Sequence, residues 1–345
     1  MGKFILVWLL AVGSAAAAPG EADLHRFEFS QVEMAVPIEL VLYAPDTTTA
    51  TTTAQAAFAR IRQLGAALSD YDPQSELRRL CDTAGEGKAI AVSEDLFRVL
   101  ARAEEISRRS EGAFDVTVGP VVNLWRRARR TRQLPTPERL QAARQLVDYR
   151  NIRLDPQHRT VELVRPGMRL DLGGIAKGYI VDEALAVLKQ HGISRVMIEA
   201  GGDIGLGEPP PGKPGWRIGI APSAPGAPPR LTLWLSGTAV ATSGDMWQYV
   251  EIGDRRYSHI VDPHTGLGLT DHSTVTVVAR EGIAADALAT AVSVLGPQRG
   301  LALIDATPGA AAMLIRAAEG QPEMFESKGW KQLLAAQPQP AEEQR

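Results

Sequence analysis

Two oxygen-bearing side chains on an otherwise apolar helix are the first candidates for chemistry. Asp286 and Thr290 lie four residues apart in the segment GIAADALATAVSVLG, so both point from one face of the predicted helix. A carboxylate on such a face needs a partner if it is buried, and an arginine or a backbone amide would serve. A carboxylate and a hydroxyl are also hard oxygen ligands, a pair that suits Mg²⁺. These residues alone leave both interpretations open.

A glycine-rich turn before a second predicted helix is the next candidate. The segment DLGGIAKGYIVDEA begins at Asp171 and runs from a strand end into the helix. Gly173 and Gly174 let a backbone approach a ligand closely, and the amides at a helix start attract phosphate oxygens. Lys177 adds a positive charge. The same pattern is typical of an ordinary turn with a solvated lysine, and it matches neither GxxxxGKS/T nor GxGxxG.

Two further segments place glycines or polar side chains at strand ends. EAGGDIG, Glu199–Gly205, follows an apolar strand and predicts either a tight hairpin turn or a ligand contact. In ATSGDMWQYVEIGDRRYSHIVDPHTG, Ala241–Gly266, His259 is either a structural histidine or a proton acceptor at a strand end. The spacing of His259, His264 and His272 matches no usual zinc signature and no cysteine joins them, so we discount a zinc site.

Short strands separated by turns must position these segments. The strands predicted after residue 150 are NIRLD, TVELV, RVMIEA, WRIGIA, LTLWLSG, YVEI, STVTVVA and AAMLIRA. Adjoining strands without a helix between each pair indicate antiparallel pairing with helices on one side. The sequence therefore predicts an α+β fold of mostly antiparallel sheet with flanking helices.

The N-terminal part is predicted as strand, loop and helix. Residues 26–43 partly alternate between apolar and polar, which predicts one or two strands with Pro37 at a bend or an edge. The threonine-rich segment Thr47–Thr53 is predicted as a loop. It leads into a helix that ends before Pro73.

The first 18 residues have the features of a secretory signal peptide. One lysine precedes an apolar run, and small residues offer a cleavage site after Ala18. No cysteine near that site could take a lipid, so we expect a soluble periplasmic protein. One domain is expected over residues 24–333, followed by a disordered tail at 334–345.

Charge argues against one class of function. The chain has 345 residues and a formal net charge of −3, whereas sequence-independent nucleic-acid binding needs clustered lysines and arginines. Five arginines between Arg126 and Arg132 are the local exception. They follow the apolar run VGPVVNLW, so a solvated helix end is preferred to a nucleic-acid patch, and a docking surface is the remaining alternative.

The order of the segments resembles the FAD:protein FMN transferases, also called ApbE-like flavin transferases. The matching segments, from about Phe29 to about Gly296, are FSQVEM, LSDYDPQSELRRL, GAFDVTVGPVVNLW, DLGGIAKGYIVDEA, EAGGDI, ATSGD, YSHIVDPHTG and ADALATAVSVLG. DLGGIAKGY together with SHIVDPHTG and DALAT is a specific combination. The resemblance implies an α+β fold of the ApbE type, similar to the T-fold.

The resemblance also implies an activity. Such enzymes transfer FMN from FAD to a Thr or Ser hydroxyl of an acceptor protein, with Mg²⁺ on the diphosphate and release of AMP. The implied acceptor is an FMN-binding subunit of a membrane redox complex. Hydrolysis of FAD by water and a non-catalytic flavin carrier are the two alternatives.

Site residues follow from the same resemblance. The implied metal ligands are Asp286, Thr290 and the backbone carbonyl of Gly174. His259 is the implied catalytic base, with help from Asp286. The implied flavin contacts are Met34, Tyr71, Ala113, Phe114, Asp115, Asp171, Lys177, Gly201, Gly202 and Ile260. One departure is that family members read M-G-T where this chain has Met34, Ala35 and Val36.

Overall fold

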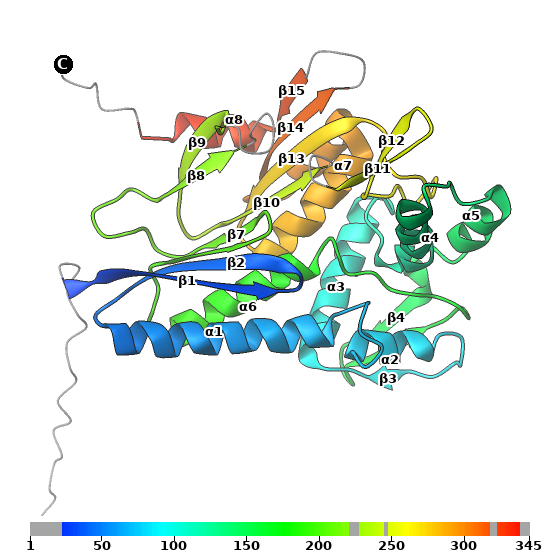
Figure 1. Cartoon of the computed structure of the whole chain (residues 1–345), viewed down its shortest axis with the longest axis horizontal. Helices are drawn as coiled ribbons and strands as arrows, with labels where there is room; N and C mark the ends of the chain where they lie inside the picture. Colours follow the sequence, from blue (N-terminus) through cyan, green and yellow to red (C-terminus); the bar gives the residue numbers. More distant parts are fainter. Residues whose placement is uncertain (1–22, 221–227, 245–247, 318–322, 339–345) are drawn as a thin grey trace, which may run out of the picture.

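The structure is a computed structural model that describes residues 23–220, 228–244, 248–317 and 323–338. The predicted signal peptide and residues 339–345 of the predicted tail lie outside the described residues. Figure 1 shows a large twisted sheet with long helices along one side, and a second group of shorter elements beside it.

An eight-stranded sheet forms the centre of the molecule. Its order is β1-β2-β6-β7-β10-β13-β14-β15, and every neighbouring pair is antiparallel. The strands are β1 (His25–Glu33), β2 (Val36–Ala44), β6 (Val196–Ala200), β7 (Asp203–Leu206), β10 (Ala239–Gly244), β13 (His272–Ala279), β14 (Ala311–Ala317) and β15 (Glu323–Glu326). This arrangement confirms the predicted α+β fold.

Four helices build the main core on one face of the sheet. They are α1 (Thr47–Ala67), α3 (Glu94–Arg109), α6 (Ala176–Gln190) and α7 (Gly282–Asp305). Three of them lie directly on the strands of the sheet, and the fourth, α3, packs against α7. Leu42, Phe58, Ile180, Val277 and Leu288 are buried together in this core. Among the described helices, α7 alone is long and apolar enough to cross a membrane by length and composition. Here its apolar side chains pack against the sheet.

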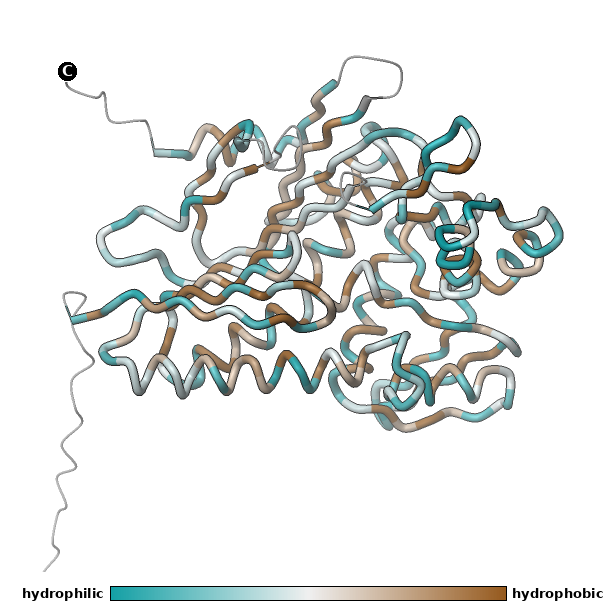
Figure 2. The backbone as a smooth tube through the Cα atoms, viewed as in Figure 1, coloured by the Kyte–Doolittle hydropathy of each residue, from teal (hydrophilic) through white to brown (hydrophobic). Residues whose placement is uncertain are grey.

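The opposite face of the sheet carries a smaller apolar layer. It is built from β8 (Trp216–Ile220), β9 (Leu231–Leu235) and α8 (Lys328–Ala335), whose Trp330 is fully buried. The end of α8 lies two residues beyond the predicted domain boundary at 333. Figure 2 shows the hydrophobic residues gathered along the central strands between these two layers.

The second group of elements packs beside the helical face. It comprises α2 (Glu76–Asp82), α4 (Gly119–Thr131), α5 (Pro137–Arg144), β3 (Ile90–Ala91), β4 (Ile152–Asp155), β5 (Thr160–Leu163), β11 (Tyr249–Ile252), β12 (Arg255–Ser258), and the 3₁₀ helices η2 (Val116–Val118) and η3 (Tyr149–Asn151). Trp125 of α4 packs against Tyr257 with ring centroids 5.1 Å apart. Its indole nitrogen donates to the Gly266 carbonyl oxygen at 2.8 Å. These contacts fix α4 next to the chain segment that carries His259.

The threonine-rich segment is helical, so the predicted loop is wrong. α1 begins at Thr47, because the carboxylate of Asp46 accepts the Thr49 amide at 2.8 Å and caps the helix. Ala50 and Thr53 then face the core. Threonine lowers helix propensity only slightly, and the cap together with the buried face outweighs that cost.

The hairpin between β1 and β2 has a tight two-residue turn. Glu33 pairs with Val36, which leaves Met34 at φ 51° and Ala35 at φ 61°. Two positive φ values define a type I′ turn, which glycine and asparagine favour. The bend therefore lies before Pro37, which pairs with Val32 inside the hairpin.

Replacing Ala35 with glycine is expected to stabilise the protein by about 0.5–1 kcal/mol, because alanine is strained in the left-handed region and glycine is not. Urea unfolding should show a higher midpoint with an unchanged slope. The matched control is Ala59→Gly on the exposed side of α1, in the interior of the helix, where glycine should destabilise by about 1 kcal/mol. A lower midpoint for Ala35→Gly would contradict the turn geometry.

Candidate functional site

Helices α6 and α7 approach each other through glycines at the centre of the site. A Cβ atom on Gly178 would lie 2.1 Å from the carbonyl oxygen of Gly282, so no side chain fits there. This close approach lets the Gly178 amide donate to Asp286 Oδ2 at 3.2 Å. Asp286 is only 6% exposed, and a backbone amide is thus the partner of its buried carboxylate.

A lysine and a second carboxylate lie beside Asp286. The Lys177 ammonium forms an ion pair with the buried carboxylate of Asp203. Burial, together with repulsion from Asp203, raises the pKa of Asp286 to about 7, although Lys177 opposes the shift. Burial alone would lower the pKa of Lys177, but the two carboxylates raise it above its usual range. One ammonium for two carboxylates leaves an uncompensated negative charge when both are ionised.

The three predicted metal ligands are brought together at this point. A Cβ atom on Gly174 would lie 2.8 Å from Thr290 Oγ1, so the Thr290 hydroxyl is adjacent to the Gly174 backbone. Thr290 follows Asp286 by one turn of α7. Within the described ranges, no group of three or more His, Cys, Asp or Glu side chains could hold a metal. The protein therefore offers one carboxylate, one hydroxyl and peptide oxygen, a hard donor set that fits Mg²⁺ if water or phosphate completes it.

The start of α6 is suited to an anion. Its N-cap residue, Ile175, makes no side-chain capping hydrogen bond, and no acidic residue lies in the first turn. Peptide dipoles leave partial positive charge at such an end, where phosphate oxygens bind readily. Lys177 lies in the same turn. The Gly178 amide of this turn already donates to Asp286, and the Ala176 amide donates to the Leu172 carbonyl, so this helix end is partly satisfied by the protein itself.

Two hairpin turns at the edge of the sheet lie next to each other. Gly201 and Gly202, at φ 58° and 97°, connect β6 to β7 immediately before Asp203. A Cβ atom on Gly201 would lie 3.1 Å from Val36 Cγ1, so this turn contacts the β1–β2 hairpin that carries Met34. The structure therefore places Gly201 and Gly202 beside Asp203, the partner of Lys177. The Met34 side chain, in contrast, packs against α1, where a Cβ atom on Gly65 would lie 3.1 Å from Met34 Cγ.

Tyr71 and Asp171 are joined by an arginine that was not predicted to belong to the site. The guanidinium of Arg126 lies over the Tyr71 ring, 4.1 Å from its centroid. It donates to Asp171 Oδ2 at 2.9 Å and forms an ion pair with Asp70. Burial, and repulsion from Asp70, raise the pKa of Asp171, which Arg126 counteracts.

The prediction that these arginines form a solvated helix end is therefore wrong for Arg126. Its side chain is 23% exposed, whereas Arg127, Arg130 and Arg132 are exposed as predicted. Helical spacing could have indicated that Arg126 is partly buried. The buried stripe of α4 consists of Val121, Trp125 and Ala128, and Arg126 borders it. The partners of Arg126 were not readable from the sequence.

The segment of Ala113, Phe114 and Asp115 is buried. Phe114 Cε2 would lie 3.4 Å from a Cβ atom on Gly174, which places the ring against the glycine turn. The Asp115 carboxylate accepts the amides of Thr117 and Tyr149, each at 2.8 Å. It thereby fixes the path of η2 and holds this segment beside the site.

His259 and Ile260 follow β12. The Nδ1 atom of His259 lies 3.0 Å from the carbonyl oxygen of Gln248. Since a carbonyl can only accept, the neutral ring carries its proton on Nδ1 and is basic at Nε2. Ile260 is buried, and its carbonyl oxygen accepts the Leu269 amide at 2.9 Å. The aspartate of ATSGD, at position 245, lies outside the described residues.

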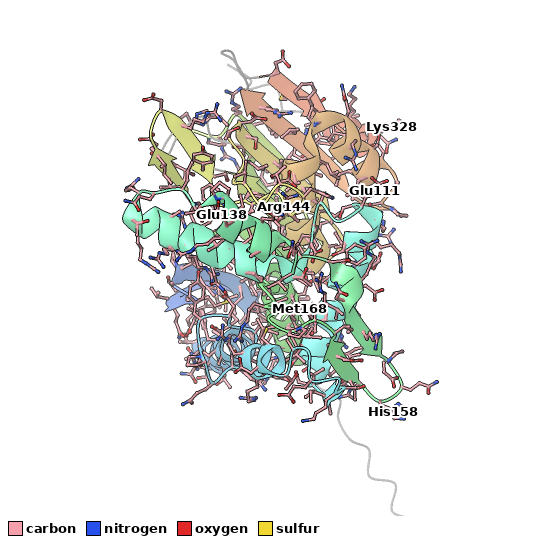
Figure 3. All side chains as sticks on the ribbon, turned by 90° about the vertical axis from the view of Figure 1, so that its right-hand side faces the viewer. Glu111, Glu138, Arg144, His158, Met168 and Lys328 are labelled. Atoms are coloured by element: carbon pink, nitrogen blue, oxygen red, sulfur yellow. The ribbon has the colours of Figure 1, made fainter. Side chains whose placement is uncertain are left out.

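A surface cavity of about 630 Å³ lies beside this region rather than at Asp286. Its walls come from the end of α3, from α5 and η3, and from the loop at His264. Glu111 and Arg144, which both line it, appear on the same face of the molecule in Figure 3. Of the predicted site residues, only Asp115 borders it.

Comparisons with known proteins agree with this geometry. The sequence model of the ApbE family matches residues 34–315. The FAD:protein FMN transferase of Haemophilus influenzae is 35% identical over 268 residues, which are 75% of this chain and 77% of that protein. The FAD:protein FMN transferase of Vibrio cholerae is 35% identical over 273 residues, 78% of this chain and 80% of that protein.

Solved structures are similar over nearly the whole chain. The flavin transferase ApbE from Vibrio cholerae superimposes with a TM-score of 0.80 at 28% identity, covering 90% of this chain and 99% of that one. The apo form of the Pseudomonas stutzeri flavinyl transferase ApbE gives a TM-score of 0.80 at 30% identity, covering 91% and 98%.

Proposed function

The chain belongs to the ApbE family and is a FAD:protein FMN transferase; from this premise we propose that it joins FMN to a threonine or serine hydroxyl with the help of Mg²⁺. One observation carries the metal proposal: Asp286, Thr290 and the Gly174 backbone lie close together at the start of α6. The uncompensated negative charge beside Lys177 supports it, because a divalent cation would neutralise that charge.

Asp286, Thr290 and the Gly174 carbonyl would hold the Mg²⁺ ion. When bound, it supplies Lewis acidity and neutralises charge on the diphosphate oxygens of FAD. The N-terminus of α6 lies on the same side, and Lys177 offsets the charge of one of the two carboxylates there. Positioning and charge neutralisation supply most of the rate in phosphoryl transfer, and this group of residues is suited to both.

The transfer is a substitution at the FMN phosphorus. The acceptor hydroxyl oxygen forms a new bond to that phosphorus, and the bond from phosphorus to the AMP oxygen breaks. AMP leaves with the electron pair, and the hydroxyl proton passes to His259 Nε2. Met34, Tyr71, Asp171, Lys177, Gly201 and Ile260 are the proposed flavin-nucleotide contacts, with Gly202 and the segment 113–115.

The acceptor is proposed to be an FMN-binding subunit of a membrane redox complex. The support is the apolar N-terminal segment, whose features predict export to the periplasm. An exported transferase meets acceptors on the outer side of the cytoplasmic membrane. Such a subunit would present a threonine or serine in an exposed loop.

The decisive experiment incubates the purified protein with FAD, MgCl₂ and an exported FMN-binding domain. We expect a covalent FMN adduct on a single hydroxyl, found by mass spectrometry, and one AMP released per adduct. EDTA should abolish both products. An acceptor with that hydroxyl replaced by alanine is the matched control.

Two other outcomes would overturn the proposal in different ways. Equal release of FMN and AMP without an adduct, at the same rate with and without acceptor, would identify a FAD hydrolase. FAD binding without any AMP release would identify a flavin carrier.

A further inference from the structure

Arg126 makes contacts that a solvated helix residue does not make. Its Nη1 atom contacts the Asp70 carboxylate, its Nη2 atom donates to Asp171 at 2.9 Å, and its Cζ atom lies over the Tyr71 ring, 4.1 Å from the centroid. Three elements thus meet at one guanidinium: α4, the loop after α1, and the turn before α6. Two of the three contacts, Tyr71 and Asp171, are proposed flavin-nucleotide contacts.

The Tyr71 ring depends on Arg126 for its orientation. Tyr71 is 76% exposed, and among the described residues none hydrogen-bonds to its hydroxyl. The loop backbone is held separately, since the amides of Tyr71 and Asp72 donate to Ser69 Oγ at 3.2 and 3.1 Å. One ring face is covered by the guanidinium, so the opposite face is open to solvent. An open aromatic face beside charged groups is a surface on which a planar ring can stack.

We propose that Arg126 is a positioning residue for the dinucleotide. It is anchored on the Asp70 and Asp171 carboxylates and holds the Tyr71 ring as a platform for one of the two ring systems of FAD. This inference rests on the proposed function, because it takes Tyr71 and Asp171 as FAD contacts. It gives a role in FAD binding to a residue that lies outside all the motifs that carry the family resemblance.

A lysine could not replace this arginine. The planar, two-armed guanidinium contacts two carboxylates at its edge while its face stacks on an aromatic ring, whereas an ammonium is a point charge without a plane. Arg126→Lys therefore separates the charge of Arg126 from its shape.

The test measures FAD binding directly, without acceptor, and then the steady-state transfer kinetics. The variants are Arg126→Met, Arg126→Lys, Tyr71→Leu and the double variant Arg126→Met/Tyr71→Leu. Arg127→Met, an exposed arginine on the same helix, is the matched control. Thermal melting checks that each variant folds. Because Tyr71 is exposed, Tyr71→Leu keeps the proposal testable if Arg126→Met fails to fold.

Arg126→Met and Tyr71→Leu should each weaken FAD binding and raise the KM for FAD about tenfold, the effect of losing one stacked ring, while kcat changes less than about twofold. The double variant should be no worse than about twofold beyond either single variant, because both remove the same platform. Arg126→Lys should resemble Arg126→Met, and Arg127→Met should resemble the wild type.

Competition with AMP and with FMN identifies the ring that stacks. The half of FAD whose inhibition constant rises in both Arg126→Met and Tyr71→Leu is the one on the platform. Unchanged FAD binding in folded Tyr71→Leu, or full rescue by Arg126→Lys, would overturn the inference. A wild-type protein that binds FAD but transfers nothing would instead overturn the proposed function and leave the platform intact.

Discussion

Replacing Asp286 with alanine should reduce FMN transfer by at least about 1000-fold, because it removes the only carboxylate of the proposed metal ligands. Lys177 would then neutralise Asp203 alone, so the charge that attracts a divalent cation would also disappear. FAD binding to the α6 N-terminus should be affected much less than turnover. Thr290→Val, which keeps the shape and removes the hydroxyl, should cause a smaller loss of about 10- to 100-fold.

Ser293→Ala is the matched control for both variants. Ser293 is a buried hydroxyl about one turn further along the same helix face, where it donates to the Ala289 carbonyl at 2.9 Å and lines a small cavity with Asp271 and Ser273. It should keep near wild-type activity. Measured transfer by Asp286→Ala at wild-type rate would refute the ligand assignment, provided that the variant melts as a folded protein.

The raised pKa of Asp286 gives the same prediction a pH signature. Below pH 7 the carboxyl group is protonated, so Mg²⁺ affinity should fall about tenfold per pH unit. The folded state keeps a proton that the unfolded chain loses near its ordinary pKa of 3.8. Stability without metal should therefore fall as pH rises from about 4 to about 7, and Mg²⁺ should raise the Tm more at pH 8 than at pH 6. Asp286→Asn should remove the pH dependence of the Mg²⁺ effect, whereas part of the stability loss should remain, because burial also raises the pKa of Asp182 to about 6.

Replacing His259 with alanine should lower kcat for transfer about 100-fold or more, the usual contribution of a general base. The KM for FAD should change less than about threefold, because the imidazole is assigned to the acceptor hydroxyl and not to the dinucleotide. The hydrogen bond from Nδ1 to Gln248 makes Nε2 the basic nitrogen. Removing the ring leaves the hydroxyl without a proton acceptor at the moment of bond formation.

A rescue experiment separates a base from a structural histidine. In His259→Gly, added imidazole should restore part of the transfer rate, since the small base can occupy the vacated space. His264→Gln is the matched control, five residues later in the same segment. It should change stability more than kcat, because His264 contacts Asp262 and the Glu111 carbonyl. No rescue together with an equal loss of FAD binding would assign His259 a structural role.

Local patterns predicted much of the site. Asp286 and Thr290 fall on one helix face because that placement depends only on residues four apart. The glycines at 201 and 202 predicted a tight turn, and both have positive φ. Strand segments without intervening helices predicted antiparallel pairing, which the sheet shows throughout.

Other features could not be predicted from the sequence, and the reasons are physical. The helix start at Thr47 depends on one capping contact from Asp46 and on burial against the sheet, neither of which threonine content reveals. The turn at Met34 and Ala35 was missed because alanine rarely adopts positive φ, and Pro37 was the stronger local signal.

The fold class, the order of the motifs and the helix face shared by Asp286 and Thr290 could be predicted from the sequence, because each depends on local spacing. Long-range packing, in contrast, pairs Lys177 with Asp203, 26 residues away, and brings Arg126 to Asp171, 45 residues away. It also brings two helices close enough at Gly178 and Gly282 for Asp286 to cap α6. Such contacts depend on how the layers pack, and the periodicity of a single segment does not record that.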